Sequence, residues 1–456
     1  MKTVILLTSM LLATASPCTA VTQDQAVSVQ NLAEQYVEAG LSPGIAIGVL
    51  DSGRVRTYCA GTLEAGSSTP VTENTIFEIG SITKVFTTVI AHRLEQQGEL
   101  SLSDPVSMHL PDHVDMKMFD GNRIMLWHLA THTSGFPKMP NNFQSADPRN
   151  PYECYTDETL YEYLADTGPD RAPGSEWRYS NLGIAILGHA LELNQDADYE
   201  ELVQKHILKP LKMSSTSCMP RDKDAGRVAT GHKGLNPTSQ WDINGPMAAA
   251  GDLNSSLKDM MRFARAAMAR SNTPLQHSIR ACQVPRVKGK YHPLGLGWMV
   301  SNSGQTIFHG GQTGGFKSNL ILMPERERAV VILLNSSPGP GMDVLSKHIL
   351  APDLVGPDNL PASMAADYTP RVPVNIDEYA GTYVNSSGPR FVVENRDGVL
   401  FAKLDDQQFF AFRPIDKDLF ACRTVDAKLR FVRDPQGRSR TLVLLQNGRG
   451  TAYNRQ

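Results

Sequence analysis

The sequence predicts an α+β fold, an α/β sandwich in which helices flank an antiparallel sheet, followed by a small C-terminal antiparallel β-barrel. Strand-like segments occur near both ends of the first 350 residues, and the stretch between them is mostly helical. This order indicates one sheet that is assembled from both ends, with a helical lobe inserted. The barrel is predicted by a change beyond residue 373, where short strands alternate with turns.

The elements of the sandwich follow from the pattern of apolar residues. Residues 24–40 carry apolar side chains at helical spacing and stop at a glycine. Residues 44–50 and 54–58 are predicted to form a hairpin around a turn of Asp, Ser and Gly. The later elements are expected at residues 306–308, 319–323 and 329–334 (strands) and 344–350 (helix).

The composition beyond residue 351 divides the rest of the chain. Residues 352–373 are rich in proline, aspartate and small residues, which is typical of a linker. Residues 374–456 contain short strands and turns, and we expect a small, lipocalin-like, up-and-down barrel there. The sandwich domain is therefore predicted to span residues 21–351.

The N-terminus has the pattern of a secretory signal peptide. Lys2 precedes an apolar run that ends in small residues, which predicts a signal over residues 1–20 with cleavage after Ala20. Cys18 is a poor lipoprotein site because Pro17 precedes it. No later stretch is long and apolar enough to span a bilayer. We expect an exported protein, periplasmic or secreted.

The composition argues against several classes of function. The net charge of −3 gives no argument for nucleic acid or an anionic membrane as partner. Besides Cys18 there are five widely spaced cysteines without a Cys-x-x-Cys pair, so we expect mostly buried free thiols, with one disulfide open. The twelve histidines are scattered and form no His-Glu-x-x-His, so we expect no metal and no cofactor.

A serine and a lysine three residues apart stand at the start of a predicted buried helix. Ser81 lies in the first turn, where unpaired N–H groups and the helix dipole favour negative charge. Lys84 lies on the same face. This pair is typical of an activated nucleophile and predicts a serine hydrolase with an acyl-enzyme. The same spacing recurs at 255–258, where we expect an ordinary helix start.

Two further stretches contain residues that could line a substrate-binding cleft. Tyr179 and Asn181 stand at a loop-to-helix junction, where they can face one cleft, although packing and helix capping also explain them. Residues 309–316 join two strands and contain four glycines, which let backbone approach a ligand.

Residues 81–84, 179–181 and 309–311 resemble, in order and spacing, the three motifs of the class C β-lactamase-related serine hydrolases. That family includes class C β-lactamases, penicillin-binding D-Ala-D-Ala carboxypeptidases, D-aminopeptidases and esterases. The resemblance covers roughly residues 25–350, and the barrel is similar to those appended to some D-aminopeptidase-like relatives. It implies a small-molecule or peptide substrate.

The resemblance also implies roles for the motif residues. Ser81 would be the acylated nucleophile and Lys84 its activator. Tyr179 would shuttle the proton to the leaving group, and Asn181 would orient the substrate amide. A tyrosine near two cations is expected to favour its phenolate form, so either Lys84 or Tyr179 could take the serine proton.

The third motif departs from the β-lactamases of this class, which have a lysine where this chain has His309. A histidine is largely neutral at its ordinary pKa, so it is a poor anchor for a substrate carboxylate. This favours D-aminopeptidase-like or esterase-like activity. The N–H groups of Ser81 and of Gln312, which follows Gly311, would form the oxyanion hole.

The sequence therefore predicts an exported serine hydrolase that acts on amide bonds, in a β-lactam or a D-amino-acid peptide. A carboxylesterase of the same fold remains an alternative, as does a penicillin- or peptide-binding receptor that is acylated without turnover. An α/β-hydrolase is excluded because no Gly-x-Ser-x-Gly occurs. The oligomeric state is left open.

Overall fold

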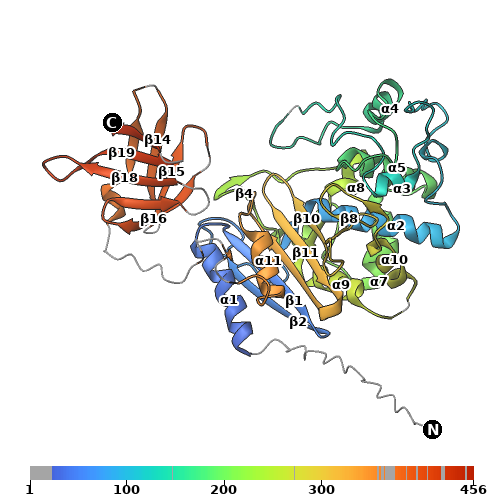
Figure 1. Ribbon diagram of the computed structural model, residues 1–456, viewed down its shortest axis with the longest axis horizontal. Coiled ribbons are helices and arrows are strands. Elements are labelled where there is room, and N and C mark those ends of the chain that lie inside the picture. The colour runs from blue at the N-terminus through green and yellow to red at the C-terminus, as the bar shows by residue number, and fades with distance from the viewer. Residues whose placement is uncertain are drawn as a thin grey trace, which may run out of the picture.

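The computed structural model describes residues 23–356 apart from 146 and 272, residues 359, 360 and 364, and residues 375–456 apart from 387, 397–398, 408, 423–426 and 447–448 (Figure 1). The predicted signal peptide and most of the predicted linker lie outside these residues.

An eight-stranded antiparallel sheet forms the centre of the sandwich, as predicted. Its order is β2-β1-β12-β11-β10-β9-β8-β7, so the N-terminal hairpin pairs with the last strand of the domain. Ile47 of β1 lies opposite Tyr58 on one side and Ile332 on the other. The strands are β1 (Gly44–Asp51), β2 (Arg54–Gly61), β7 (Val287–Lys288), β8 (Pro293–Leu294), β9 (Met299–Val300), β10 (Ile307–Gln312), β11 (Lys317–Met323) and β12 (Arg328–Leu334).

Helices cover both faces of this sheet. On one face, α1 (Gln23–Glu38) packs on β1 and β2, and α11 (Met342–Leu350) packs on β11 and β12. On the other face, α9 (Leu257–Met268) packs on β1, β11 and β12. All eight residues of β1 are buried, because its side chains meet helices on either side.

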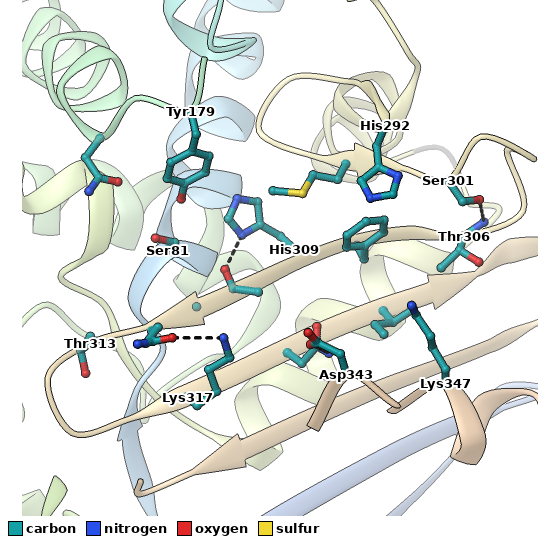
Figure 2. Close-up of a pocket in the computed structure, with 18 of the residues that line it drawn as sticks. Ser81, Tyr179, His292, Ser301, Thr306, His309, Thr313, Lys317, Asp343 and Lys347 are labelled. Carbon is teal, nitrogen blue, oxygen red and sulfur yellow. Dashed lines mark hydrogen bonds between the residues drawn. The ribbon is translucent and has the colours of Figure 1, made fainter. Parts of the chain in front are cut away.

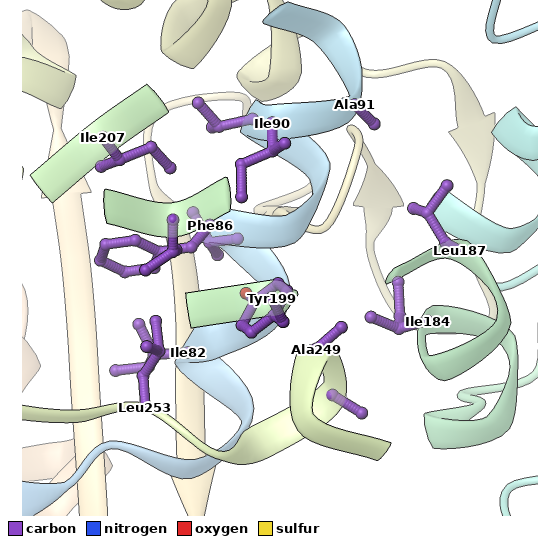
Figure 3. Packing of buried hydrophobic residues seen from close by; sticks show 14 of the residues in the cluster. Ile82, Phe86, Ile90, Ala91, Ile184, Leu187, Tyr199, Ile207, Ala249 and Leu253 are labelled. Carbon is purple, nitrogen blue, oxygen red and sulfur yellow. The ribbon is translucent and has the colours of Figure 1, made fainter. Parts of the chain in front are cut away.

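The helical lobe is inserted between β2 and β7, on the α9 face of the sheet. It surrounds α2 (Thr83–Gln97), in which eleven of the fifteen residues are buried. Figure 3 shows Ile82, Phe86 and Ile90 packed among Tyr199, Ile207 and Leu253. The other helices are α3 (Leu126–Ala130), α4 (Asp157–Asp166), α5 (Asn181–Gln195), α6 (Tyr199–Val203), α7 (Lys209–Leu211), α8 (Ala248–Gly251) and α10 (Pro274–Gln283). Two small sheets pair β3 (Ile76–Glu78) with β6 (Asn254–Ser256) and β4 (Gly231–Lys233) with β5 (Asn236–Thr238).

The C-terminal segment forms a closed barrel whose eight strands follow one another in chain order, which confirms the predicted up-and-down barrel. Its interior is filled by side chains such as Tyr379, Phe420 and Phe431. The strands are β13 (Gly381–Val384), β14 (Arg390–Arg396), β15 (Val399–Leu404), β16 (Phe410–Asp416), β17 (Leu419–Cys422), β18 (Ala427–Arg433), β19 (Ser439–Gln446) and β20 (Arg449–Arg455).

Three smaller sequence predictions have clear outcomes in the described residues. Ser256 caps α9 by accepting a hydrogen bond from the Asp259 N–H, so the second Ser-x-x-Lys is a helix start. Cys282 and Cys422 are buried, whereas the other three cysteines of the described residues are partly or fully exposed, so burial of most thiols is not seen. Among the described helices, none has the length and apolar character that a membrane crossing requires.

Candidate active site

The first motif forms a compact pair at the start of α2. Ser81 lies in a one-turn helix, η1 (Gly80–Ile82), that leads directly into α2. Lys84 donates hydrogen bonds to Ser81 Oγ at 3.0 Å and to the Ala250 carbonyl oxygen at 2.5 Å. These two bonds hold the fully buried Lys84 side chain against the serine hydroxyl.

Glycines bring β10 against the nucleophile. A Cβ on Gly311 would lie 1.9 Å from the Ile79 carbonyl oxygen, and one on Gly80 would lie 2.9 Å from the Gln312 backbone nitrogen. Gly80 also has φ of +51°, which favours glycine. Glycines at these two positions therefore allow the Gln312 backbone to lie against Gly80, the residue before Ser81.

The structure extends β10 further than the sequence predicts. Residues 309–312 belong to the strand, and the turn begins only at Thr313. The pairing with β11 continues to Gln312 opposite Lys317, and Ser318 donates a hydrogen bond to the Ile79 carbonyl oxygen at 2.7 Å. These contacts hold the glycine-rich segment in an extended conformation that local sequence alone does not favour.

The second motif lies on the opposite side of the cleft. Ser180, and not Asn181, caps α5 by accepting a hydrogen bond from the Gly183 N–H. Asn181 is thus free to line the pocket, where its amide oxygen is buried without a hydrogen-bond partner among the described residues. The Tyr179 ring lies 5.2 Å from Lys84 Nζ and also lines the pocket.

His309 is held in one tautomer. Its Nδ1 lies 2.8 Å from the Gly310 carbonyl oxygen, which can only accept, so Nδ1 carries the proton. Its Nε2 is therefore a lone-pair acceptor, and it has no hydrogen-bond partner among the described residues. Burial and the charge of Lys84 lower the pKa of His309 to about 3, so the ring is neutral.

Burial sets the protonation states of the other two groups. It lowers the pKa of Lys84 to about 7, and the charge of Lys138 acts in the same direction. It raises the pKa of Tyr179 above its ordinary value, and the hydrogen bond with Ser81 only partly offsets this. The expected phenolate is therefore wrong, because desolvation raises the pKa of Tyr179 by more than the hydrogen bond with Ser81 lowers it. Lys84 is the group that can accept a proton near neutral pH.

The three motifs line one cavity of about 870 Å³. Figure 2 shows Ser81, Tyr179 and His309 grouped together, with Thr313 toward one end and Ser301, Thr306 and Lys347 toward the other. Gln312 and Gly311 also line the cavity. No group of three His, Cys, Asp or Glu residues in the described part of the chain could hold a metal ion.

Sequence reasoning missed an aromatic wall at the Thr313 end of the cavity. The Tyr152 ring contacts those of Phe143 and Trp241 in a tilted arrangement, with ring centroids 5.1 and 5.4 Å apart. The backbone N–H of Trp241 donates a hydrogen bond to the buried Glu78 carboxyl at 3.0 Å. Burial raises the pKa of Glu78 to about 7. Phe143 and Tyr152 lie in the connection between α3 and α4, and Trp241 lies between β5 and α8. These connections have no periodicity, so the sequence gives no signal for the three aromatic residues.

A comparison with protein families identifies the fold. Residues 29–351, more than half of the chain, match the family described as Beta-lactamase. The chain belongs to the β-lactamase family. This confirms the resemblance that the motifs indicated, and it places the chain among serine hydrolases such as class C β-lactamases and D-Ala-D-Ala carboxypeptidases.

Individual members of the β-lactamase family are similar to this chain. The D-alanyl-D-alanine-carboxypeptidase/endopeptidase AmpH of Escherichia coli K12 is 27% identical over 329 residues, 68% of this chain and 84% of that protein. The β-lactamase/D-alanine carboxypeptidase of Pseudomonas syringae has a similar structure, with a TM-score of 0.62 and 22% identity over 72% of this chain and 98% of that one.

One solved structure is similar over more than the β-lactamase-family domain. The octameric penicillin-binding protein homologue of Pyrococcus abyssi covers 92% of this chain and 97% of its own, with a TM-score of 0.62 and 23% identity. Its similarity shows a shared fold that continues beyond residue 351.

Proposed function

We propose that this protein hydrolyses amide or ester bonds through an acyl-Ser81 intermediate. The observation that carries the proposal is the buried Lys84 amine, 3.0 Å from Ser81 Oγ, with a pKa near neutrality. A neutral amine at that distance can take the serine proton as the oxygen attacks a carbonyl carbon. The oxyanion would be stabilised by the N–H groups of Ser81 and Gln312.

The proton then has a route to the leaving group. Tyr179 is a neutral phenol, so it can donate its proton to the departing nitrogen or oxygen as the bond to carbon breaks. The phenolate that remains is reprotonated by the Lys84 ammonium, which lies 5.2 Å from the ring. Water attacks the acyl-enzyme in the second half of the reaction and regenerates Ser81.

The neutral His309 favours substrates that need no carboxylate anchor. Position 309 supplies no fixed cation, which argues for D-amino-acid amides over β-lactams or carboxypeptidase substrates. The unpartnered amide oxygen of Asn181 supports an amide substrate, because it can accept a hydrogen bond from a substrate N–H. A carboxylesterase is the second candidate, and the apolar far end of the cavity favours it.

We further propose that the protein is exported. The charged residue, the apolar run and the small residues of positions 1–20 support a cleaved signal peptide. Detection of a mature N-terminus at Val21 in the periplasm or culture medium would support this, and an uncleaved cytoplasmic chain would contradict it.

Covalent labelling tests the proposed nucleophile. A fluorophosphonate or fluorescent penicillin should label the wild type, and Ser81→Ala should abolish both labelling and hydrolysis while circular dichroism stays unchanged. Ser255→Ala is the matched control, and it should keep its activity. Near-normal turnover by Ser81→Ala would remove the proposal. A label that never leaves would instead identify an acylated receptor.

A substitution at position 309 tests the proposed substrate class. His309→Lys adds a cation, which is worth on the order of 1–4 kcal/mol beside a carboxylate in a partly desolvated cleft. We expect kcat/KM to rise for a chromogenic β-lactam, and to stay level or fall for a neutral ester and a D-amino-acid amide. A uniform loss on all three substrates would show that His309 has a structural or catalytic role instead.

A further inference from the structure

We propose that the leaving group of the natural substrate carries a neutral apolar arm, and that this arm lies in a groove between β10, β11 and α11. The inference rests on the proposed function. We call this region the leaving-group groove, and its lining comprises Thr306, Phe308, Ile321, Met323, Leu350, Leu354 and Val355.

The leaving-group groove is continuous with the catalytic cleft. Ser81 and Tyr179 line the same cavity as Met323 and Val355, and Figure 2 shows Thr306 and Lys347 on the far side of His309 from Ser81. A volume of about 870 Å³ is large for one amino-acid amide and lies in the range that holds a drug-sized ligand. The cavity therefore has room for a substrate that extends well beyond the scissile bond.

The groove exists because the helices cover only part of the sheet. On this face α1 packs on β1 and β2, and α11 packs on β11 and β12. Of the neighbouring strands, β9 pairs with β10 only at Ile307 and Phe308. Phe308 is consequently only half-buried at the edge of an otherwise closed apolar core. An apolar ligand placed there would complete the packing that no described helix supplies.

The position of Tyr179 decides which half of the substrate enters the groove. Tyr179 is the proposed proton donor to the leaving group, and its ring lies 6.5 Å from that of His309. The next residue along β10, Phe308, opens the groove. The acyl half is left for the opposite end, where Trp241 packs against Gly314 in the turn after β10.

Charges at the rim favour a neutral arm. Lys347 and Asp343 both line the cavity and lie one helical turn apart on α11, so opposite charges stand side by side. Lys317 donates a hydrogen bond to the Gln312 side chain at 3.3 Å. The other two lysines that line the cavity, Lys138 and Lys317, lie toward Lys84 and Gln312 at the catalytic end. The groove itself is lined mainly by apolar side chains, so the chemistry that fits it is an ester or amide of an apolar alcohol or amine.

A leaving-group series tests the inference. We would measure kcat/KM for ethyl, butyl and hexyl esters of acetate and of D-alanine, because these alcohols differ little in acidity and mainly in length. Burial of each added methylene should raise kcat/KM by roughly two- to fourfold. Leu354→Glu puts a charge at the groove end, and Thr306→Trp fills it. Both should remove the dependence on length.

Two controls separate this effect from general damage. Leu193→Glu changes another exposed leucine, on α5 and outside the cavity lining, and should keep the length dependence. Trp241→Ala should alter the response to acyl size while the response to alcohol length persists. A flat series in active wild-type enzyme, or a series unchanged in Leu354→Glu, would overturn the inference. No ester turnover and no Ser81 labelling would remove the proposed function itself.

Discussion

The catalytic assignment depends on two side chains whose environments push their pKa values apart. Lys84 and Tyr179 both lie in the core of the site, and burial favours the neutral form of each. A neutral amine is a base, whereas a neutral phenol is an acid. The same desolvation therefore makes Lys84 a general base and Tyr179 a general acid, and such pairs are typical of active sites.

This division predicts a specific pH dependence. Because burial lowers the pKa of Lys84 to about 7, its base form is populated above that pH and lost below it. We expect kcat/KM to rise with pH through about 7. Tyr179→Phe should lower kcat by roughly 10²-fold, the usual effect of removing a general acid–base group, yet keep the same acid limb. If the limb disappears in Tyr179→Phe, the tyrosine and not the lysine is the base.

For single residues, the sequence predicts which side chains form the site better than it predicts their protonation states. Ser81, Lys84 and Tyr179 stand out because their motifs are short and ordered. The tautomer of His309 cannot be predicted from the sequence, because it depends on the carbonyl oxygen of Gly310 and on burial by distant residues. The phenolate expectation for Tyr179 is wrong for the same reason, because desolvation cannot be read from neighbours along the chain.

Among the elements, β10 departs most from what its sequence favours. Two glycines within a strand weaken it, yet one of them, Gly311, permits the close approach of β10 to Ile79, the residue before η1. Regular elements were predictable, because β1 and α5 carry continuous apolar patterns that match their burial. Local patterns could not place the end of β10, since its pairing partners lie in other segments.

The close approach of β10 predicts the effect of one methyl group. In Gly311→Ala, the new Cβ would meet the Ile79 carbonyl oxygen and force β10 away from Ser81. We expect a loss of activity of at least tenfold. The free energy of unfolding should fall by about 1–3 kcal/mol, which is typical of overpacking, and the melting temperature should fall with it. Gly226→Ala is the control, because nothing lies within 4 Å of its added Cβ. Full activity in Gly311→Ala would mean that the oxyanion site does not need this approach.

For the whole molecule, the boundary between the domains can be tested by truncation. Met364, within the predicted linker, is 3% exposed and packs in the buried cluster that contains residues of α1 and α11, so we expect the sandwich domain to need the chain as far as this residue. A chain that stops after Met364 should fold and label at Ser81. One that stops at Asp353 should be less stable. Folding without labelling in the longer fragment would show that the barrel contributes to the site.

The construction of the sheet from both ends of the domain has a consequence for biosynthesis. Ile47 of β1 finds its partner Ile332 only after the whole helical lobe has been made. Such distant pairings close slowly, because the loop entropy is lost before the contacts are gained. The segment that places Gln312 beside Ser81 also comes late in the chain. A growing polypeptide would therefore contain Ser81 before it contains the strand that completes the site. Hydrolytic activity would appear only once synthesis has passed β12.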